Sequence, residues 1–326
     1  MRLLVTGGAG YVGSITVETL VEAGHHVVVV DDLRMGHRAA VHEAAAFVRG
    51  DIGDGDLIGR VVREHRVEAI LHFAAASLVG ESMSDPHRYF ASNTVTSLAL
   101  LRALAEHGVE RIVFSSTAAL YGTPATTPIR EDAPLAPESV YGETKLQIER
   151  TMTWLARTTG LAAVSLRYFN AAGASAERGE DHRPETHLIP LVLQVALGQR
   201  DHVRVFGDDY PTRDGTAVRD YIHVLDLADA HVRALDALEP GKAKAYNLGN
   251  GAGASVAEVI AAVRDVTGAE IPTVTEGRRA GDPPTLVADA SAARRELGWE
   301  PRHPALEEIV RSAWAWHRSH PQGYGA

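Results

Sequence analysis

Short apolar runs alternate with longer amphipathic stretches through the first half of the chain. The short runs are continuously apolar, as expected for strands that are covered on both faces. The longer stretches place apolar residues at helical spacing. We therefore predict an α/β protein with right-handed βαβ units and a doubly wound parallel sheet. The predicted strands are Leu3–Thr6, His26–Val30, Ala46–Arg49, Ala69–Phe73, Arg111–Ser115 and Ala162–Arg167, and the predicted helices are Tyr11–Ala23, Asp56–Glu64, Tyr89–His107 and Ser139–Thr158.

This rhythm changes after about Ala172. The segment Ala174–Pro184 is polar and rich in Glu and Arg, and we predict that it forms a surface loop. The mixture of short strands and helices beyond it predicts a smaller C-terminal α/β domain. We place the first domain at 1–172 and the second at 173–326, with about 218–248 returning to the first. The expected elements are strands at His202–Phe206 and Val218–His223 and helices at Ile189–Leu197, Leu225–Leu238, Val256–Val266 and Leu306–Arg318.

Composition narrows the class of protein. A chain of 326 residues is long enough for two domains. Its net charge of −10 disfavours non-specific binding to nucleic acid or acidic membranes, because both need a positive protein face. Cys is absent, which excludes disulfides, thiolate metal sites and a Cys nucleophile, and no residues are assigned to a metal. We see no secretory signal and no apolar run near the ~20 residues that span a bilayer, so we expect a cytoplasmic protein.

Three glycines punctuate the junction between the first predicted strand and helix. Gly7, Gly10 and Gly13 stand where a tight turn must approach a ligand closely and where the helix must pack near the sheet. The N-terminus of the following helix offers free N–H groups and the positive end of a dipole to phosphates. This context predicts a dinucleotide site rather than a simple strand-terminating turn.

Carboxylates follow the second and third predicted strands. Asp31 or Asp32 can accept hydrogen bonds from the adenosine ribose hydroxyls, and an Asp here repels a 2′-phosphate. The cofactor is therefore predicted to be NAD rather than NADP. Asp51 and Ile52 are expected to face the adenine.

The glycine spacing resembles that of the extended short-chain dehydrogenase/reductase family, whose cofactor domain has the Rossmann fold. The resemblance implies a catalytic Tyr-x3-Lys downstream, and Tyr141 and Lys145 supply it on a predicted helix. Positions i and i+4 share a helical face, so the phenol and the ammonium point the same way. A phenol with a pKa near 10 is a poor base, and a nearby cation lowers that pKa. Lys145 is one of only three Lys residues, with Lys242 and Lys244.

The same resemblance assigns further residues around the cofactor. It implies that Thr117, at the end of the fifth predicted strand, bonds the substrate oxygen beside Tyr141. Where relatives often carry Lys, this chain has Ser77, which removes one expected contact at the nicotinamide side. The cofactor contacts implied in this way, besides the glycines and the carboxylates, are Tyr11, Val12, Leu33, Phe73, Ala74, Ala75, Asn93, Ser115, Tyr141, Lys145 and Tyr168.

Several blocks of the second half resemble the nucleotide-sugar epimerases of this family. The resemblance covers essentially the whole chain and implies C4 epimerisation of UDP-galactose and UDP-glucose, through a 4-keto intermediate and transient reduction of bound NAD. Its most specific block is Asp214-Gly215-Thr216-Ala217-Val218-Arg219-Asp220-Tyr221-Ile222-His223. The other blocks are Arg167–Asn170, Phe206–Thr212, Tyr246–Gly249, Arg279-Ala280-Gly281-Asp282 and His320–Tyr324.

A nucleotide-sugar ligand suits the chemistry of these blocks. Arg219 and Arg279 match the Arg forks that hold a diphosphate. The resemblance assigns Asp282 to the uridine ribose, Asn170 to the sugar and first phosphate, and Phe206 to the uracil. His187 stands where relatives have Asn, and Leu286 where some carry Tyr, so a smaller gate could admit N-acetylated sugars. The remaining substrate contacts implied by the resemblance are Thr117, Tyr141, Phe169, Leu188, Val205 and Tyr221.

Alternative functions are weighed on the same residues. A dehydratase is disfavoured because Ala118 and Ala119, rather than an acidic pair, follow Thr117. A UDP-glucuronate epimerase or decarboxylase remains open, as does a non-catalytic NAD-sensing regulator. A structural or interaction module is disfavoured, because the chain has no tail or coiled-coil seam. By resemblance we expect a homodimer that uses the predicted helices Tyr89–His107 and Ser139–Thr158.

Overall fold

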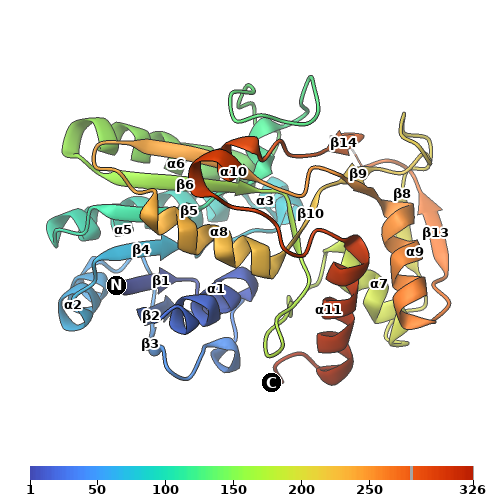
Figure 1. Ribbon diagram of the computed structural model, residues 1–326, viewed down its shortest axis with the longest axis horizontal. Coiled ribbons are helices and arrows are strands. Elements are labelled where there is room, and N and C mark those ends of the chain that lie inside the picture. Colours follow the sequence, from blue (N-terminus) through green and yellow to red (C-terminus); the bar gives the residue numbers. More distant parts are fainter. Residues whose placement is uncertain (280–281, 326) are drawn as a thin grey trace.

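Seven parallel strands form the central sheet of the computed structural model, which describes residues 1–279 and 282–325. Their order is β11-β6-β5-β4-β1-β2-β3 (Figure 1). Strands are added to one side of β1 as far as β3 and then to the other side from β4 onward, so the switch point lies between β1 and β4. The strands are β1 (Arg2–Thr6), β2 (His26–Asp31), β3 (Ala46–Arg49), β4 (Ala69–His72), β5 (Arg111–Ser115), β6 (Ala162–Tyr168) and β11 (Ala243–Leu248).

Helices cover both faces of this sheet. Within β1, Leu3 and Val5 join one apolar cluster and Leu4 joins the other, because successive side chains of a strand point to opposite faces. The first cluster includes residues of α1 (Tyr11–Glu22), α8 (Val224–Asp236) and α10 (Ser291–Leu297). The second includes residues of α2 (Gly55–His65), α5 (Thr96–Glu106) and α6 (Val140–Thr159). The predicted doubly wound α/β fold is confirmed.

A second group of elements has its own apolar core beside the sheet (Figure 1). It contains α7 (Leu188–Ala196), α9 (Val256–Thr267), α11 (Leu306–Ser319), β8 (Val203–Phe206) and β13 (Thr273–Glu276). Segments 224–236 and 243–248 lie with the first region instead: α8 packs on α1, and β11 pairs with β6. The division near residue 172 stays a prediction.

Among the described residues, no helix is both long and apolar enough to cross a bilayer.

The predicted strand Val218–His223 is two strands that belong to different sheets. β9 (Val218–Arg219) lies between β12 (Ala254–Ser255) and β14 (Thr285–Leu286), whereas β10 (Tyr221–His223) pairs with β7 (Asn170–Ala172). The break falls at Asp220, which is fully buried. Its carboxylate accepts hydrogen bonds from the backbone N–H groups of Asn250, Gly251 and Ala288 at 2.8–3.0 Å. These bonds turn the chain between the two sheets, so the single-strand prediction was wrong.

The predicted helix Tyr89–His107 is also interrupted. It consists of α4 (Pro86–Tyr89), the π-helical segment η2 (Phe90–Val95) and α5, and α3 (Val79–Ser84) precedes it. The wider π turn carries Asn93, whose side chain bonds both the N–H and the carbonyl of Ala76 at 2.8 and 3.0 Å. The interruption thus ties the helix to the loop after β4. Two further short turns are η1 (Arg38–Ala40) and η3 (Ala118–Tyr121).

The predicted surface loop Ala174–Pro184 is partly buried, and that prediction was wrong. Arg178 is 9% exposed and donates to Glu18 of α1 at 2.6 Å and to the Ala40 carbonyl at 2.7 Å. Glu180 is 4% exposed. Charged side chains can be buried when they are paired, and a count of polar residues does not reveal such pairing.

Candidate active site

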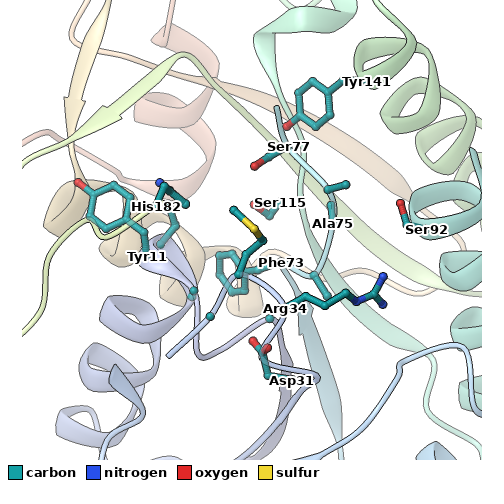
Figure 2. A pocket seen from close by; sticks show the side chains of 18 of the residues that line it. Tyr11, Asp31, Arg34, Phe73, Ala75, Ser77, Ser92, Ser115, Tyr141 and His182 are labelled. Atoms are coloured by element: carbon teal, nitrogen blue, oxygen red, sulfur yellow. The ribbon is translucent and has the colours of Figure 1, made fainter. Parts of the chain in front are cut away.

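A cleft of about 410 Å³ follows the carboxyl ends of the parallel strands, where open α/β sheets bind ligands. Figure 2 shows Tyr141 and Ser77 at one end of this cleft and Asp31 at the other. Tyr11 and His182 stand together along one side of it (Figure 2). The cleft is therefore long enough to hold an extended ligand between a carboxylate and a phenol.

The glycine-rich turn forms the floor of the cleft. Gly7 has φ +71°, and a Cβ there would lie 2.5 Å from the backbone nitrogen of Ala74. A Cβ on Gly13 would lie 2.2 Å from the Gly7 carbonyl oxygen. Among the described residues, no side chain caps the N-terminus of α1 at Gly10, so its first N–H groups face the cleft. This bare, positively polarised helix end fits a pyrophosphate.

Asp31 ends β2 and is 8% exposed at the opposite end from Tyr141. Its carboxylate accepts hydrogen bonds from the backbone N–H groups of Ala9 and Leu33 at 3.0 and 2.9 Å, and burial raises its pKa. The Arg34 guanidinium lies nearby, 2.5 Å from Asp32 and 3.4 Å from Asp51. These two carboxylates compensate a cation that could otherwise attract a 2′-phosphate, which fits NAD.

Lys145 and Thr117 meet Tyr141 at the closed end of the cleft. Lys145 is 3% exposed, and its Nζ donates to the Ser115 carbonyl at 2.8 Å. The same Nζ lies 5.9 Å from the centroid of the Tyr141 ring. Thr117 lines the same part of the cleft as Tyr141, and its Oγ1 accepts from the Ala119 N–H at 3.1 Å. The phenol, the hydroxyl and the ammonium therefore share one pocket wall.

Burial dominates the electrostatics of this group. It lowers the pKa of Lys145 to about 7, opposed in part by the charge of Glu149. Burial also raises the pKa of Tyr141; Tyr168 adds to the rise, and the Thr117 side chain opposes it. The protein residues alone therefore do not produce the lowered phenol pKa that the spacing of Tyr141 and Lys145 predicts. A further positive charge in the cleft is needed to make the phenol a base.

Local contacts fix the helix that carries the phenol. α6 begins after Ser139, whose Oγ accepts from the Gly142 N–H at 3.1 Å. The backbone N–H of Tyr141 donates to Ser82 Oγ of α3 at 3.1 Å. Ser115 Oγ and the Tyr168 hydroxyl lie 2.8 Å apart beneath this helix. The phenol is thus positioned by two helices and two strand ends.

Most of the predicted cofactor residues lie on the cleft. Those that line it are Gly7, Gly10, Tyr11, Val12, Gly13, Asp31, Asp32, Asp51, Ile52, Phe73, Ala74, Ala75, Ser115, Tyr141, Lys145 and Tyr168. Asn93 is not among the residues that line the cleft. It is fully buried, and its side-chain amide forms hydrogen bonds with the Ala76 backbone and with Thr144 Oγ1, 3.1 Å away. Leu33 is partly buried and packs against the first apolar cluster. Direct contact of these two residues with the cofactor stays a prediction.

The predicted nucleotide-sugar residues divide into three groups. Thr117, Tyr141, Phe169, Asn170 and His187 line the cleft. Val205 and Tyr221 are buried in the apolar core of the second region, and Leu188 packs against it, so their contacts with substrate stay predictions. The remaining four gather beside β9.

These four residues form two contacting pairs. Arg219 is ion-paired with Asp282, and the Arg279 guanidinium lies 3.9 Å from the centroid of the Phe206 ring. The Asp282 N–H and the Arg279 carbonyl are 3.3 Å apart, which joins the pairs. Leu286 pairs with Arg219 in the small sheet and packs near Phe169. Ala280 and Gly281 of the same block lie outside the described residues.

Several cleft residues had no sequence signal. Arg34, Arg88, Ser92 and Thr96 line it from loops and from the interrupted helix. Glu180 and His182 come from the segment predicted to be a surface loop. Coulomb attraction to Glu180 raises the pKa of His187 well above its usual value. The unusual density of Glu and His between 180 and 187 was the one available clue.

Comparison with known proteins agrees with this geometry. The sequence model of the NAD dependent epimerase/dehydratase family matches residues 3–249. The UDP-glucose 4-epimerase of Halalkalibacterium halodurans is 52% identical over 99% of this chain and 98% of its own length. A crystal structure of a UDP-glucose 4-epimerase superposes with a TM-score of 0.96 at 48% identity, over 99% of both chains. That of the Stenotrophomonas maltophila enzyme, with bound NAD and formylated UDP-arabinopyranose, gives 0.94 at 44% identity, also over 99% of both.

Proposed function

The chain belongs to the NAD dependent epimerase/dehydratase family, and on this premise we propose that it interconverts UDP-galactose and UDP-glucose by inverting the sugar at C4. The observation that carries the proposal is that Tyr141, Thr117 and buried Lys145 line one end of a cleft that begins at the glycine turn. This arrangement suits proton transfer at a sugar hydroxyl.

The cofactor is NAD, and the donor set of the cleft fits it. The bare N-terminus of α1 suits the pyrophosphate, and Asp31 suits the adenosine ribose. When bound, NAD accepts the C4 hydrogen as hydride and returns it, and its nicotinamide carries the positive charge that the Tyr141 site lacks. Lys145 is buried where it can bond a ribose hydroxyl and hold charge near the phenol.

Tyr141 takes the proton from the sugar 4-hydroxyl and later gives it back. Thr117 lines the cleft beside the phenol, where its hydroxyl can bond the same sugar oxygen. After oxidation the sugar is a 4-keto species, and it must turn so that its other face meets the cofactor. A pocket that allows this turn must hold the sugar loosely and the nucleotide firmly.

The nucleotide is held by the group beside β9. We propose that Arg219 and Arg279 bind the diphosphate, Asp282 the uridine ribose and Phe206 the uracil. The ion pair of Arg219 with Asp282 and the stacking of Arg279 on Phe206 keep these side chains together. Both pairs must open or shift to admit the ligand, so part of the binding energy goes into that rearrangement.

The direct test uses no added cofactor. Protein purified with its own NAD is incubated with UDP-galactose, and the products are separated by anion-exchange chromatography. The proposal expects UDP-glucose to appear and the reverse reaction to run from UDP-glucose. Bound NAD without turnover of either sugar would instead favour the non-catalytic regulator.

We also propose a homodimer formed through α5 and α6. Large apolar side chains are exposed on these elements and on the preceding η2: Trp154 is 64% exposed, Val95 60% and Leu98 41%. Light scattering after size-exclusion chromatography should give twice the monomer mass for the parent protein and the monomer mass for Trp154→Glu.

A cytoplasmic location stays a prediction that cell fractionation would test.

A further inference from the structure

Four potential metal ligands converge beside the cleft. Glu180, His182, Glu185 and His187, here called the Glu/His cluster, each offer one ligand atom, and these atoms all lie within 4.8 Å of one another. Three of the four residues line the cleft. Three of them also line a second cavity of about 180 Å³, which reaches Trp316, His317 and His320 near the end of α11. The cluster is the wall between the two cavities.

The cluster has too few protons for its acceptors. His187 Nδ1 lies 2.7 Å from Glu180 Oε1 and 2.9 Å from Glu185 Oε1. One ring nitrogen carries at most one proton, so it can donate fully to only one of these carboxylates. His182 Nδ1 approaches the same Glu180 oxygen at 3.1 Å. A cation placed among these atoms would take one ligand atom from each of the four residues at once.

The two carboxylates are buried and held in place. The side chains of Glu180 and Glu185 are each 5% exposed. The backbone N–H groups of Thr186 and His187 donate to Glu185 Oε1 at 2.6 and 2.8 Å, which keeps that carboxylate against the imidazole. Buried carboxylates this close together need compensating positive charge. The site is therefore built before any ion binds.

We propose that the Glu/His cluster is a Zn²⁺ site with two imidazole nitrogen and two carboxylate oxygen ligands. Zinc takes such ligands at ~2.0–2.2 Å in tetrahedral geometry. To reach it, the His187 Nδ1 contacts at 2.7 and 2.9 Å must widen, and the ligand atoms that lie up to 4.8 Å apart must draw together. Magnesium and calcium favour all-oxygen sets, which this cluster is not. Four protein ligands fill the coordination sphere, so the ion holds segment 180–187 against the cleft rather than activating water.

This site does not depend on the proposed epimerase activity. The ion would tie residues that border the cleft to the start of α7, because His187 immediately precedes that helix. Binding to the folded state alone would also stabilise the protein, since ligand binding adds to the free energy of unfolding. Zinc content and thermal stability are therefore the readouts, and both can be measured without substrate.

The experiment uses untagged full-length protein treated with EDTA, freed of chelator and then given ZnCl₂. After gel filtration, mass spectrometry of the metal content should find about one zinc per chain, and the melting temperature should rise by several degrees over the EDTA-treated protein. His182→Gln and Glu185→Gln should each weaken zinc binding at least ~10-fold in calorimetric titrations. The control is His26→Gln. His26 is exposed at the N-terminal end of β2, away from the carboxyl ends that form the cleft, and this variant should bind zinc as the parent does.

A second readout protects the test against variants that misfold. Co²⁺ added to the unmutated protein in place of Zn²⁺ should give the intense visible absorption bands of a tetrahedral site. The proposal is overturned if the unmutated protein retains no zinc after gel filtration. It is equally overturned if His182→Gln and Glu185→Gln retain zinc as well as the parent, or if cobalt gives only the weak bands of an octahedral complex.

Discussion

The Arg167 guanidinium and the Glu149 carboxylate form a buried ion pair, with Nη2 2.6 Å from Oε2 and side chains 6% and 8% exposed. Ser116 Oγ also donates to Glu149 Oε1, at 2.5 Å. Glu149 lies on α6, one turn beyond Lys145, and Ser116 directly precedes Thr117. The pair therefore locks the helix that carries Tyr141 to β6 and to the strand end that carries Thr117.

Breaking this pair should cost much of the stability of the protein. Glu149→Gln leaves the Arg167 guanidinium buried without a counter-charge, and loss of one partner of a buried pair typically costs ~3–5 kcal/mol. Urea denaturation should show this loss. The matched control is Glu106→Gln, which breaks the exposed pair with Arg102 and should change the free energy of unfolding by less than ~0.5 kcal/mol. Equal effects of the two substitutions would contradict the role given to Glu149.

Removing the phenolic oxygen should abolish most turnover. Tyr141→Phe deletes the proton acceptor while keeping the ring, and we expect kcat to fall roughly 10²- to 10⁴-fold, the usual contribution of a general base. The NAD content of the purified variant should be unchanged. Tyr246→Phe is the control, because Tyr246 is not a cleft residue. Its hydroxyl donates to Glu296 Oε2 at a distance of 3.0 Å. A Tyr141→Phe protein with full activity would refute the mechanism.

Lys145 should impose a pH dependence on the stability of the NAD-free protein. Its pKa is about 7 in the folded chain and 10.5 in its ordinary state, so the unfolded chain holds an extra proton between these values. Stability should therefore rise with pH across that window, and the cost of burying the ammonium is fully present below pH 7. Urea denaturation at pH 6 to 9 should show this slope in the parent and in Lys242→Met.

Lys145→Met should lack that slope, because Met carries no proton to lose. Its stability at pH 6 should match or exceed that of the parent, although its turnover should be strongly reduced. The paired outcome distinguishes a buried catalytic ammonium from a structural one, whose removal would lower stability at every pH. A variant that is less stable than the parent at pH 6 would contradict this account.

His72 should make the protein sensitive to acid. Burial lowers its pKa to about 3, with a smaller effect of Lys145, and its two ring nitrogens bond Thr6 Oγ1 and Ser97 Oγ at 2.7 and 2.9 Å. The unfolded chain binds a proton near pH 6.5 and the folded chain does not, so stability should be lost as pH falls from 6.5 toward 3. His72→Gln should flatten this loss, whereas exposed His87→Gln should not.

Two adjacent arginines should differ in their effect on substrate binding. Arg279 lies over Phe206 in the proposed nucleotide site, whereas Arg278 is paired with Asp209 and lies 4.4 Å from the Tyr210 ring centroid. Arg279→Ala should raise KM for UDP-galactose at least ~10-fold, because a charge-assisted hydrogen bond is worth ~1.5–3 kcal/mol. Arg278→Ala should change KM far less. Reversed effects would move the diphosphate site to the other side of β13.

The sequence by itself determined the features that arise from neighbours along the chain. Continuous apolar runs identified the first six strands of the sheet, since strands covered on both faces consist mostly of apolar residues. The glycines and the Tyr141–Lys145 spacing indicated the chemistry, because a tight turn and one helical face are local properties. These signals were enough to predict the doubly wound fold and most of the cleft lining.

Only the tertiary structure decided what depends on distant partners. It showed that Glu180 lines the cleft and that the Asn93 side chain forms hydrogen bonds with the Ala76 backbone. It also showed that the predicted strand breaks at Asp220 into two strands of different sheets. It also showed that burial raises the pKa of Tyr141, whereas the spacing from Lys145 predicts a lowered pKa. Burial and pairing are sums over residues far apart in the chain, so a polar pattern that reads locally as surface can be compensated and enclosed once the chain folds.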